Sequence, residues 1–355
     1  MAEAWIRSKS AALDVAIAEA ANLLAGSRFP VIAGLGTDVA GARAAVELAQ
    51  CLGGAIDHMH SEFLLRDLDV MREAGMMVTT PNEARLRADF LLLVGPGLLE
   101  TWPALPTELF GKRRTVWLCP DTAVKDASAY KNIDVVGDAS FDLPVMLAVL
   151  RARCAGRPAA NAPVAMAAID ALVGELREAR FGVAVWSAAQ HDRLTIEMLC
   201  GLVNDLNQST RFSGLPLATA DNADGVQQVT GWMTGFPLRT GFGRGLPEHD
   251  PWRFDASRLI DSGEADCALW ISAYGTRPPA WKRGVPLVAL TAETGTPRAH
   301  VTIAVGRPGI DHNAVEHLPA TATLAALSAG KPSTAMSVAT VLGRIIAALP
   351  AARRC

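Results

Sequence analysis

Residues 57–62 bring together the side chains that most resemble a metal site. His58 and His60 alternate along a segment that we expect to be extended, which would project both rings to one side. A two-histidine metal site needs a third ligand, and Asp57 or Glu62 could supply it. No other part of the chain repeats the arrangement as a partner, so we favour surface or interface histidines and predict no metal ligand.

A second polar cluster follows Gly309-Ile310 and comprises Asp311, His312, Glu316 and His317. The i, i+5 spacing of its histidines does not align them on one helical face, so we interpret this cluster as a loop. A G-x-S-x-G elbow is absent from the sequence, which excludes this signature of triad hydrolysis. Asp121 follows an expected strand and could either cap a helix or meet a cofactor hydroxyl; capping is the commoner role.

Gly34, Gly36 and Gly41 follow the first expected strand and partly match a dinucleotide motif. Asp57 lies 21 residues after Gly36, where an acid would meet a ribose. The third glycine of G-x-G-x-x-G would stand at Val39, however, so a tight strand-to-helix turn is the better interpretation. The same stretch also resembles the middle domain of thiamine-diphosphate enzymes, but their metal-anchoring G-D-G motif is missing.

The six cysteines are scattered and form no C-x-x-C pair, which argues against a zinc ribbon, a ferredoxin-type cluster or a secreted disulfide framework. Two of them lie in expected helices and two in expected strands, so we predict buried structural thiols. The cysteines are Cys51, Cys119, Cys154, Cys200, Cys267 and Cys355.

Composition excludes several classes of function. The 355 residues suffice for two domains, and 50% of them are apolar while only 19% are charged, which favours buried contacts with other polypeptides. A formal net charge of -3 without a basic cluster predicts no nucleic-acid binding. Apolar runs are strand-sized and the N-terminus lacks a signal peptide, so we expect a cytoplasmic protein that does not enter a membrane.

Apolar strands alternate with helical patterns in the first part of the chain, which predicts a parallel sheet covered on both faces. Thr80 before Pro81 is a plausible helix N-cap. The expected helices are 11–24, 40–52 and 63–73, and the expected strands are 30–34, 55–57, 90–95, 115–119 and 133–137.

A Pro/Ala-rich passage at residues 155–165 is typical of a linker, and a similar pattern restarts after it. We therefore predict an α/β protein with two doubly wound Rossmann-like lobes, residues 1–155 and 156–330, followed by a C-terminal helix and tail, 331–355. The second lobe has expected helices 165–179 and 194–206 and strands 183–186, 212–217, 267–272, 286–290 and 301–305; the closing helix is 337–349.

The segment Gly231 to Pro251 is rich in glycine and carries aromatic side chains at Trp232, Phe236 and Phe242. We interpret it as a long loop. Such a loop within a compact domain is typically functional or buried against a partner, and its glycines permit close backbone approach.

One stretch, NADGVQQVTGWMTGFPLRTGFGRGLP, has a Gly, Trp and Arg spacing that resembles the B subunit of formylmethanofuran dehydrogenase, a molybdopterin oxidoreductase. RFPVIAGLGTDVAGARAAVELAQCLGGAIDH and NEARLRADFLLLVGPGLLETWP resemble the same family. The resemblance covers almost the whole chain. It implies two lobes of the molybdopterin oxidoreductase type without the N-terminal iron-sulfur domain, since residues 1–50 contain no cysteine.

The resemblance also implies that the cofactors are lost. The metal-ligating cysteine of the family corresponds to Phe63, and a phenyl ring has no lone pair for tungsten or molybdenum. Arg244 matches an arginine that the family directs toward the active site. We expect no catalytic residue, pterin, metal or iron-sulfur cluster; vestigial pterin-groove positions would be Gly34, Gly36, Gly95, Gly97, Trp232, Gly235 and Gly243.

The pattern is most similar to the methylotrophic relative of this enzyme, the formyltransferase/hydrolase complex. That complex converts formyl-tetrahydromethanopterin to formate through a methanofuran-like carrier in formaldehyde oxidation. The resemblance implies a noncatalytic scaffold whose partners are the hydrolase (A), C and formyltransferase (D) subunits, chiefly the hydrolase. Two alternatives stay open: an active tungsten or molybdenum pterin oxidoreductase, and a stand-alone nucleotide-binding module.

Overall fold

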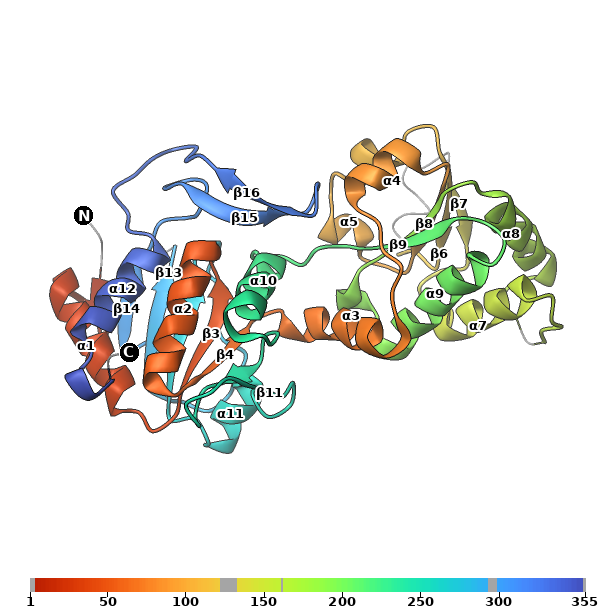
Figure 1. The fold of residues 1–355 in the computed structure, drawn as a ribbon. Helices are drawn as coiled ribbons and strands as arrows, with labels where there is room; N and C mark the ends of the chain where they lie inside the picture. The colour runs from red at the N-terminus through yellow and green to blue at the C-terminus, as the bar shows by residue number, and fades with distance from the viewer. Residues whose placement is uncertain (1–3, 122–132, 161, 293–298, 354–355) are drawn as a thin grey trace. The chain divides into compact units, whose positions relative to one another are not determined.

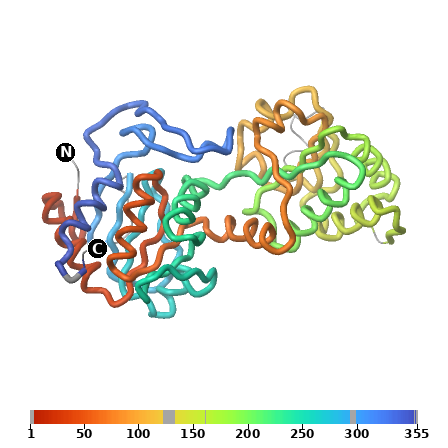
Figure 2. The backbone as a smooth tube through the Cα atoms, in the orientation of Figure 1, coloured from red at the N-terminus to blue at the C-terminus, as the bar shows by residue number. Residues whose placement is uncertain are grey.

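The computed structural model describes residues 4–121, 133–160, 162–292 and 299–353. The chain forms two compact units (Figure 2). Unit 1 consists of Met1–Glu62, Ala220–Leu318 and Thr323–Cys355, and unit 2 of Phe63–Thr219 and Pro319–Ala322. Both ends of the chain therefore belong to unit 1, and unit 2 is an insertion between its strands.

Unit 1 is built on a nine-stranded sheet whose centre is parallel. The parallel strands lie in the order β4 (Ala55–His58), β3 (Pro30–Gly36), β12 (Cys267–Ser272), β13 (Leu287–Thr291) and β14 (Val301–Ala304). Short antiparallel strands extend both sides: β10 (Thr240–Gly241) and β11 (Glu248–His249) beside β4, and β1 (Ala4–Ile6) and β2 (Lys9–Ala11) beside β14. The central strands are almost wholly buried, which explains their continuous apolar sequence.

Helices cover this sheet (Figure 1). Four of them pack side by side: α1 (Leu13–Gly26), α12 (Val338–Ala348), α2 (Val39–Leu52) and α10 (Ala223–Thr234). The shorter α11 (Ala256–Ser262) contacts β3 and β4 and shares a core cluster with Val31 and Ala33 of β3. A hairpin of β15 (Ala314–Leu318) and β16 (Thr323–Leu327) completes the unit.

Unit 2 contains a five-stranded sheet that is parallel throughout. Its order is β7 (Ile133–Val136), β6 (Arg114–Leu118), β5 (Phe90–Val94), β8 (Gly182–Trp186) and β9 (Phe212–Pro216). The helices are α3 (Ser61–Ala74), α4 (Pro81–Arg87), α5 (Leu98–Thr101), α7 (Leu143–Cys154), α8 (Met166–Glu178) and α9 (Arg193–Leu206), with a π-helical turn at Pro106–Phe110.

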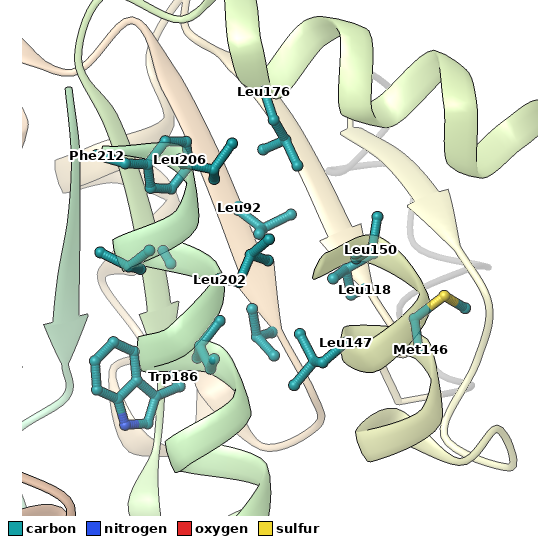
Figure 3. Close-up of a cluster of buried hydrophobic side chains, with 14 of the residues drawn as sticks. Leu92, Leu118, Met146, Leu147, Leu150, Leu176, Trp186, Leu202, Leu206 and Phe212 are labelled. Atoms are coloured by element: carbon teal, nitrogen blue, oxygen red, sulfur yellow. The ribbon is translucent and has the colours of Figure 1, made fainter. Parts of the chain in front are cut away.

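Both faces of the unit 2 sheet are buried. Leu92 and Leu118 pack against α7, α8 and α9 in one cluster, which includes Leu147 and Leu202 (Figure 3). Leu91, the neighbour of Leu92, points to the other face and joins a cluster with residues of α4 and α5. This alternation confirms the prediction of parallel strands covered on both sides.

The prediction of domain boundaries is wrong. The expected boundary at residue 155 lies inside unit 2, and the expected linker, residues 155–165, joins α7 to α8 of that unit. The expected first lobe is divided, because β5 pairs with β6 and β8 whereas β3 pairs with β4 and β12. Alternating strands and helices predict a parallel sheet, but they do not specify which strands pair. The expected separate C-terminal part contains α12, which packs against α1 and α2 of unit 1.

Two expected loops contain regular structure. Gly231 and Trp232 lie in the last turn of α10, which ends at Gly235, and β10 and β11 follow. Glu316 and His317 lie in β15. The sequence did not predict the end of α10 or the strand β15, because both lie next to strong turn residues: the glycines after residue 230 in one case and Pro308-Gly309 in the other. Turn residues beside a short helix or strand make its hydrophobic periodicity harder to recognise. Thr80 is confirmed as an N-cap: its hydroxyl accepts a hydrogen bond from the Glu83 N–H at 3.1 Å.

Cys119, Cys200 and Cys267 are buried, as predicted, and burial raises the pKa of the Cys200 and Cys267 thiols to about 12. Cys154 is half-buried, with a pKa raised by burial to about 11. The prediction is wrong for Cys51, which is half-buried and disulfide-bonded. Cys355 lies outside the described residues.

Candidate functional site

A cavity of about 200 Å³ opens at the carboxyl ends of β3, β4 and β12 in unit 1. This is the edge where open α/β sheets bind ligands. The lining combines charged and aromatic side chains, among them Asp57, His58, Arg239, Arg277, Trp270 and Trp281. Trp270 and Trp281 meet edge to face, with ring centroids 5.5 Å apart. The cavity is large enough for part of a small molecule. Its lining contains both carboxylate and guanidinium side chains.

Asp57 is the most perturbed carboxylate of this cavity. Its side chain is buried, and one oxygen accepts a hydrogen bond from the Ala256 N–H at 2.9 Å. The other oxygen, Oδ1, lies 3.5 Å from Nε of Arg239, and neither atom has a hydrogen-bond partner among the described residues. Burial raises the pKa of Asp57 to about 6, although the positive charge of Arg239 opposes the shift.

Arg239 is held in place by several contacts within unit 1. Its guanidinium pairs with Asp255 at 2.6 Å and donates a hydrogen bond to the Pro251 carbonyl at 2.6 Å. Its φ of 62° is in the left-handed region, which is uncommon for a residue with a side chain. Sequence reasoning missed Arg239, because the signal was only an arginine within a glycine-rich segment.

His58 is not a metal ligand in this arrangement, because both ring nitrogens are engaged. Nδ1 accepts a hydrogen bond from the His60 N–H at 3.0 Å, and Nε2 lies 3.2 Å from the Asp221 carbonyl, to which it can donate. This pattern describes a neutral imidazole. Burial is the main cause that lowers the pKa of His58 to about 3, and His60 contributes.

His60 contacts a carboxylate and a guanidinium at the same nitrogen. Its Nε2 lies 2.9 Å from Oδ2 of Asp221 and 2.9 Å from Arg277. Both His58 and His60 are buried within the chain, so the expectation of surface or interface histidines is wrong. Asp221 was missed, and its φ of 58° next to Asn222 reflects a turn that the sequence DNAD could have suggested. No cluster of three potential metal ligands occurs among the described residues.

The second polar cluster has structural partners. The Tyr274 hydroxyl donates a hydrogen bond to Glu316 at 2.9 Å, and burial raises the pKa of both groups. The His317 N–H donates to Asn222 at 2.9 Å. Asp311 accepts from the Arg307 N–H at 2.7 Å, and His312 Nδ1 lies 2.9 Å from the Asn313 carbonyl. These contacts fix the β15 region.

Gly34 and Gly36 each lie close to a neighbouring segment, and a Cβ on Gly36 would lie 3.2 Å from Cε of Met59. Gly34 has a φ of +79°, and a Cβ there would lie 2.5 Å from the Ile271 carbonyl oxygen. The register between β3 and β12 shifts at this point. The N-terminus of α2, where a dinucleotide phosphate would bind, is capped by the Asp38 carboxylate, which accepts from the Gly41 N–H at 2.9 Å. A second anion there would be repelled, which argues against the nucleotide alternative.

In unit 2, side chains cover the two predicted groove glycines. Gly95 and Gly97 both have positive φ, but a Cβ on Gly95 would overlap the ring of His191, and one on Gly97 would overlap Gln190. His191 is buried, and its Nε2 lies 3.2 Å from the Val94 carbonyl. Asp121 accepts a hydrogen bond from the Gly97 N–H at 2.8 Å, at the residue that precedes α5.

The other predicted groove residues of unit 1 lie in and after α10. Trp232 is 54% exposed, and Gly235 ends α10 with a φ of 78°. Gly243 is close to Phe29, with a Cβ position 3.5 Å from that ring. Arg244 is exposed and forms an ion pair with Glu248 at 2.9 Å. None of these four residues lines the cavity beside Asp57.

Phe63 lies in the first turn of α3 and is half-buried. It packs against the larger core cluster of unit 2, and the guanidinium carbon of Arg66 lies 5.4 Å from its ring centroid. The position thus has an apolar and cation–π environment.

The comparisons with known proteins agree with this architecture. No protein-family model matches the chain. The chain is 36% identical over 318 residues to the B subunit of the formyltransferase/hydrolase complex Fhc from Methylorubrum extorquens, in an alignment that covers 86% of this chain and 85% of that protein. It is also similar to the B subunit of tungsten-containing formylmethanofuran dehydrogenase 2 from Methanocaldococcus jannaschii (28% identity) and Methanococcus maripaludis (24%), in each case over 73% of this chain and 64% of that protein. The chain thus spans less than two thirds of the tungsten-containing proteins.

A solved structure covers nearly the whole chain. It is the X-ray crystal structure of the formyltransferase/hydrolase complex (FhcABCD) from Methylorubrum extorquens in complex with methylofuran. One of its chains matches with a TM-score of 0.86 and 34% identity, over 96% of this chain and 97% of that chain. The likeness in sequence and structure extends through both units, and this chain belongs to the family of the B subunit of the formyltransferase/hydrolase complex.

Proposed function

We propose that this chain is a noncatalytic scaffold within a formyltransferase/hydrolase complex. The complex converts formyl-tetrahydromethanopterin to formate by way of a methanofuran-like carrier in formaldehyde oxidation. The chain assembles with the hydrolase (A), C and formyltransferase (D) subunits in the cytoplasm. None of the helices that the structure describes combines the length and hydrophobicity needed to span a bilayer.

The observation that carries the proposal is the environment of Phe63. The resemblance implies a thiolate ligand to the metal at this position, whereas this chain has a phenyl ring there, which has no lone pair to bind a metal and packs against an apolar core. The residues at this position do not fit the metal.

The glycine positions of unit 2 do not fit a pterin either. His191 and Gln190 occupy the space in front of Gly95 and Gly97, which a cofactor would need for close backbone approach. The chain therefore uses these side chains to complete its own packing. This supports a scaffold whose former groove is filled.

We further infer that the two units descend from Rossmann-like lobes of the molybdopterin oxidoreductase type. Support comes from the parallel strands that continue on both sides of β3 in unit 1 and of β5 in unit 2. The order β7-β6-β5-β8-β9 is that of an open sheet with a switch point between β5 and β8. The identity to tungsten-containing relatives favours the same ancestry.

That identity also favours the alternative, an active pterin oxidoreductase. The alternative requires a partner residue or water to complete the metal shell where Phe63 stands, and a cofactor able to displace His191. The scaffold proposal needs neither.

Reconstitution tests the proposed function. The four subunits are co-expressed with an affinity tag on the hydrolase, with and without this chain, and formate release from formyl-tetrahydromethanopterin is measured. We expect assembly and turnover to require this chain, whereas Phe63→Leu leaves turnover within about twofold, because an apolar side chain of similar volume preserves the packing. A complex that assembles and turns over fully without the chain, or a Phe63→Leu complex that assembles but is inactive, contradicts the proposal.

A further inference from the structure

Cys51, in the last turn of α2, differs from the other cysteines that the structure describes. It is half-buried and disulfide-bonded, whereas the other four are thiols. These four are Cys119, Cys154, Cys200 and Cys267. The sequence contains six cysteines, so within this chain only Cys355 remains to provide the second sulfur of the bond.

The last described residues of the chain lie beside Cys51. The short 3-10 helix Ala351–Arg353 follows α12, and the Arg353 guanidinium donates to the carbonyl of Leu52 at 3.1 Å and to that of Ser27 at 3.4 Å. Leu52 is the residue after Cys51 and the last residue of α2. These hydrogen bonds hold the segment after α12 at the end of α2 that carries Cys51.

The remaining span suits a disulfide. Cys355 follows Arg353 by two residues, and two residues of extended chain span at most about 7 Å. The Cα atoms of two disulfide-bonded cysteines lie about 4 to 7 Å apart. The contact of Arg353 with Leu52 therefore puts Cys355 within reach of Cys51.

We propose that Cys51 and Cys355 form a reversible redox pair whose disulfide ties the segment after α12 to the end of α2. The co-reactant is a low-molecular-weight disulfide. One cysteine thiolate attacks a sulfur of this disulfide and displaces one thiolate, and the second cysteine then attacks the mixed disulfide and displaces the other. The two cysteines lose two electrons and two protons, and the small disulfide becomes two thiols. An excess of the small thiol reverses the exchange.

The surroundings of Cys51 favour a bond that responds to thiols. Disulfides that are open to solvent exchange more readily than buried ones, and Cys51 is only half-buried. In the cytoplasm, where we propose that the chain acts, disulfides are usually transient. Only the choice of a cytoplasmic thiol rests on the proposed function, because the pairing itself concerns the chain alone.

The fold of unit 1 does not depend on this bond. The helix α12 buries Val341, Leu342 and Ile345 and packs against α1 and α2. Reduction therefore releases the segment after α12, where Arg353 retains its two hydrogen bonds, and leaves the sheet and its helices folded. The redox state thus sets how firmly this segment is held.

The other thiols do not compete in this exchange. Burial raises the pKa of Cys154 to about 11 and that of Cys200 and Cys267 to about 12. A protonated thiol is a poor nucleophile, so these three cysteines react slowly with a small disulfide at neutral pH. A mild oxidant therefore acts selectively on the proposed pair.

Peptide mapping of the full-length chain tests the pairing. The chain is equilibrated with glutathione disulfide, alkylated and cleaved after glutamate without reduction, which places Cys51 in residues 48–62 and Cys355 in residues 317–355. We expect mass spectrometry to find these two peptides joined, and to find them separate after treatment with dithiothreitol. Separate peptides in the oxidised chain overturn the inference, as does a link from either peptide to another cysteine or to a second chain.

Thermal unfolding tests the effect of the bond. The oxidised wild type should unfold about 5 °C or more above the reduced wild type, because the bond restricts the unfolded chain. The difference should vanish in Cys51→Ser and in Cys355→Ser. Cys154→Ser is the matched control, since it replaces a half-buried thiol of unit 2 and should keep the full difference. Equal midpoints of oxidised and reduced wild type, or a difference that persists in Cys355→Ser, overturn the inference.

A redox titration tests reversibility. In mixtures of glutathione and glutathione disulfide, the thiols of Cys51 and Cys355 should appear and disappear together, while circular dichroism shows that the chain stays folded. A bond that is reduced only when the chain unfolds would be a permanent structural link, and this result contradicts the proposed redox pair.

Discussion

The strands β3 and β5 end in the same short motif but in different surroundings. Gly34-Leu35-Gly36 ends β3 in unit 1, and Gly95-Pro96-Gly97 follows β5 in unit 2. At the first motif the backbone of β12 approaches Gly34, and a cavity of about 200 Å³ stays open beside it. At the second, the side chains of His191 and Gln190 fill the space.

This difference shows which structural features a Gly-x-Gly motif can predict and which it cannot. Both motifs have glycine at positive φ, so the sequence correctly indicates a tight turn. What lies in front of each turn comes from residues far away in sequence: Ile271 in one case and His191 in the other. A Gly-x-Gly motif therefore predicts backbone geometry, whereas its availability to a ligand depends on tertiary contacts.

Alanine substitutions at Gly34 and Gly95 should distinguish the two environments by how much each lowers the free energy of unfolding. Gly34→Ala places a methyl group against the Ile271 carbonyl oxygen, a backbone atom that cannot move without shifting the sheet, and we expect a loss of about 3 kcal/mol in the free energy of unfolding. Gly95→Ala has a similar φ but meets the His191 side chain, so we expect about 2 kcal/mol. Urea unfolding of each variant measures both values.

Gly95→Ala combined with His191→Ala provides the control for this pair. The double variant should lose less stability than the sum of the two single changes, because removal of the ring relieves the overlap. Additive losses would show that His191 does not cover Gly95.

The stability of unit 1 should also depend on pH, because His58 is buried in its neutral form at the end of β4. Its pKa is about 3 in the folded protein and about 6.5 when unfolded, so the unfolded state binds the proton more readily. The stability that this group contributes is complete above about pH 6.5 and is lost as the pH falls toward 3. Between about pH 7 and about pH 5 protonation of His58 should remove about 2 kcal/mol from the free energy of unfolding, a contribution that His58→Gln lacks. Equal slopes for both proteins would contradict the neutral, buried imidazole.

Asp57 should act in the opposite direction and more weakly. Its pKa is raised from 3.8 to about 6, so the folded state binds the proton more readily, and the stability it contributes at low pH is lost as the pH rises through 6. Between about pH 5 and about pH 7 we expect Asp57 to remove about 1 kcal/mol. Because His58 makes stability rise with pH over the same range, Asp57→Asn should make this part of the profile steeper by about 1 kcal/mol, measured by urea unfolding across the pH range. A flatter profile in the variant would mean that Arg239 outweighs burial.

Much of the local fold follows from the sequence. Continuous apolar runs such as Phe90–Val94 predict buried parallel strands, and Thr80-Pro81 predicts the start of α4. The pairing of the strands does not follow, because β3 meets β12, more than 230 residues later, and no local pattern encodes that contact. For this reason the predicted boundary at residue 155 is wrong.

The candidate site was predictable only in part. Asp57, His58 and His60 stood out by residue type, and the structure does bring them to the end of a strand. Their roles depend on Asp221, Arg239 and Arg277, which reach them from the segments after residue 219. These contacts accompany the burial of His58 and His60. Residues 57–62 alone do not reveal such distant partners, and for this reason we expected surface or interface histidines.

We propose that this chain holds no heavy-metal cofactor, because the resemblance puts Phe63 at the position of the family's metal-binding cysteine. Elemental analysis of the purified complex, produced with added tungstate and molybdate, tests it most directly. The account predicts tungsten and molybdenum at background, no more than about one atom per hundred complexes, because an apolar side chain offers no ligand. Tungsten or molybdenum at one atom per copy of this chain, lost in a complex assembled without it, would contradict the account.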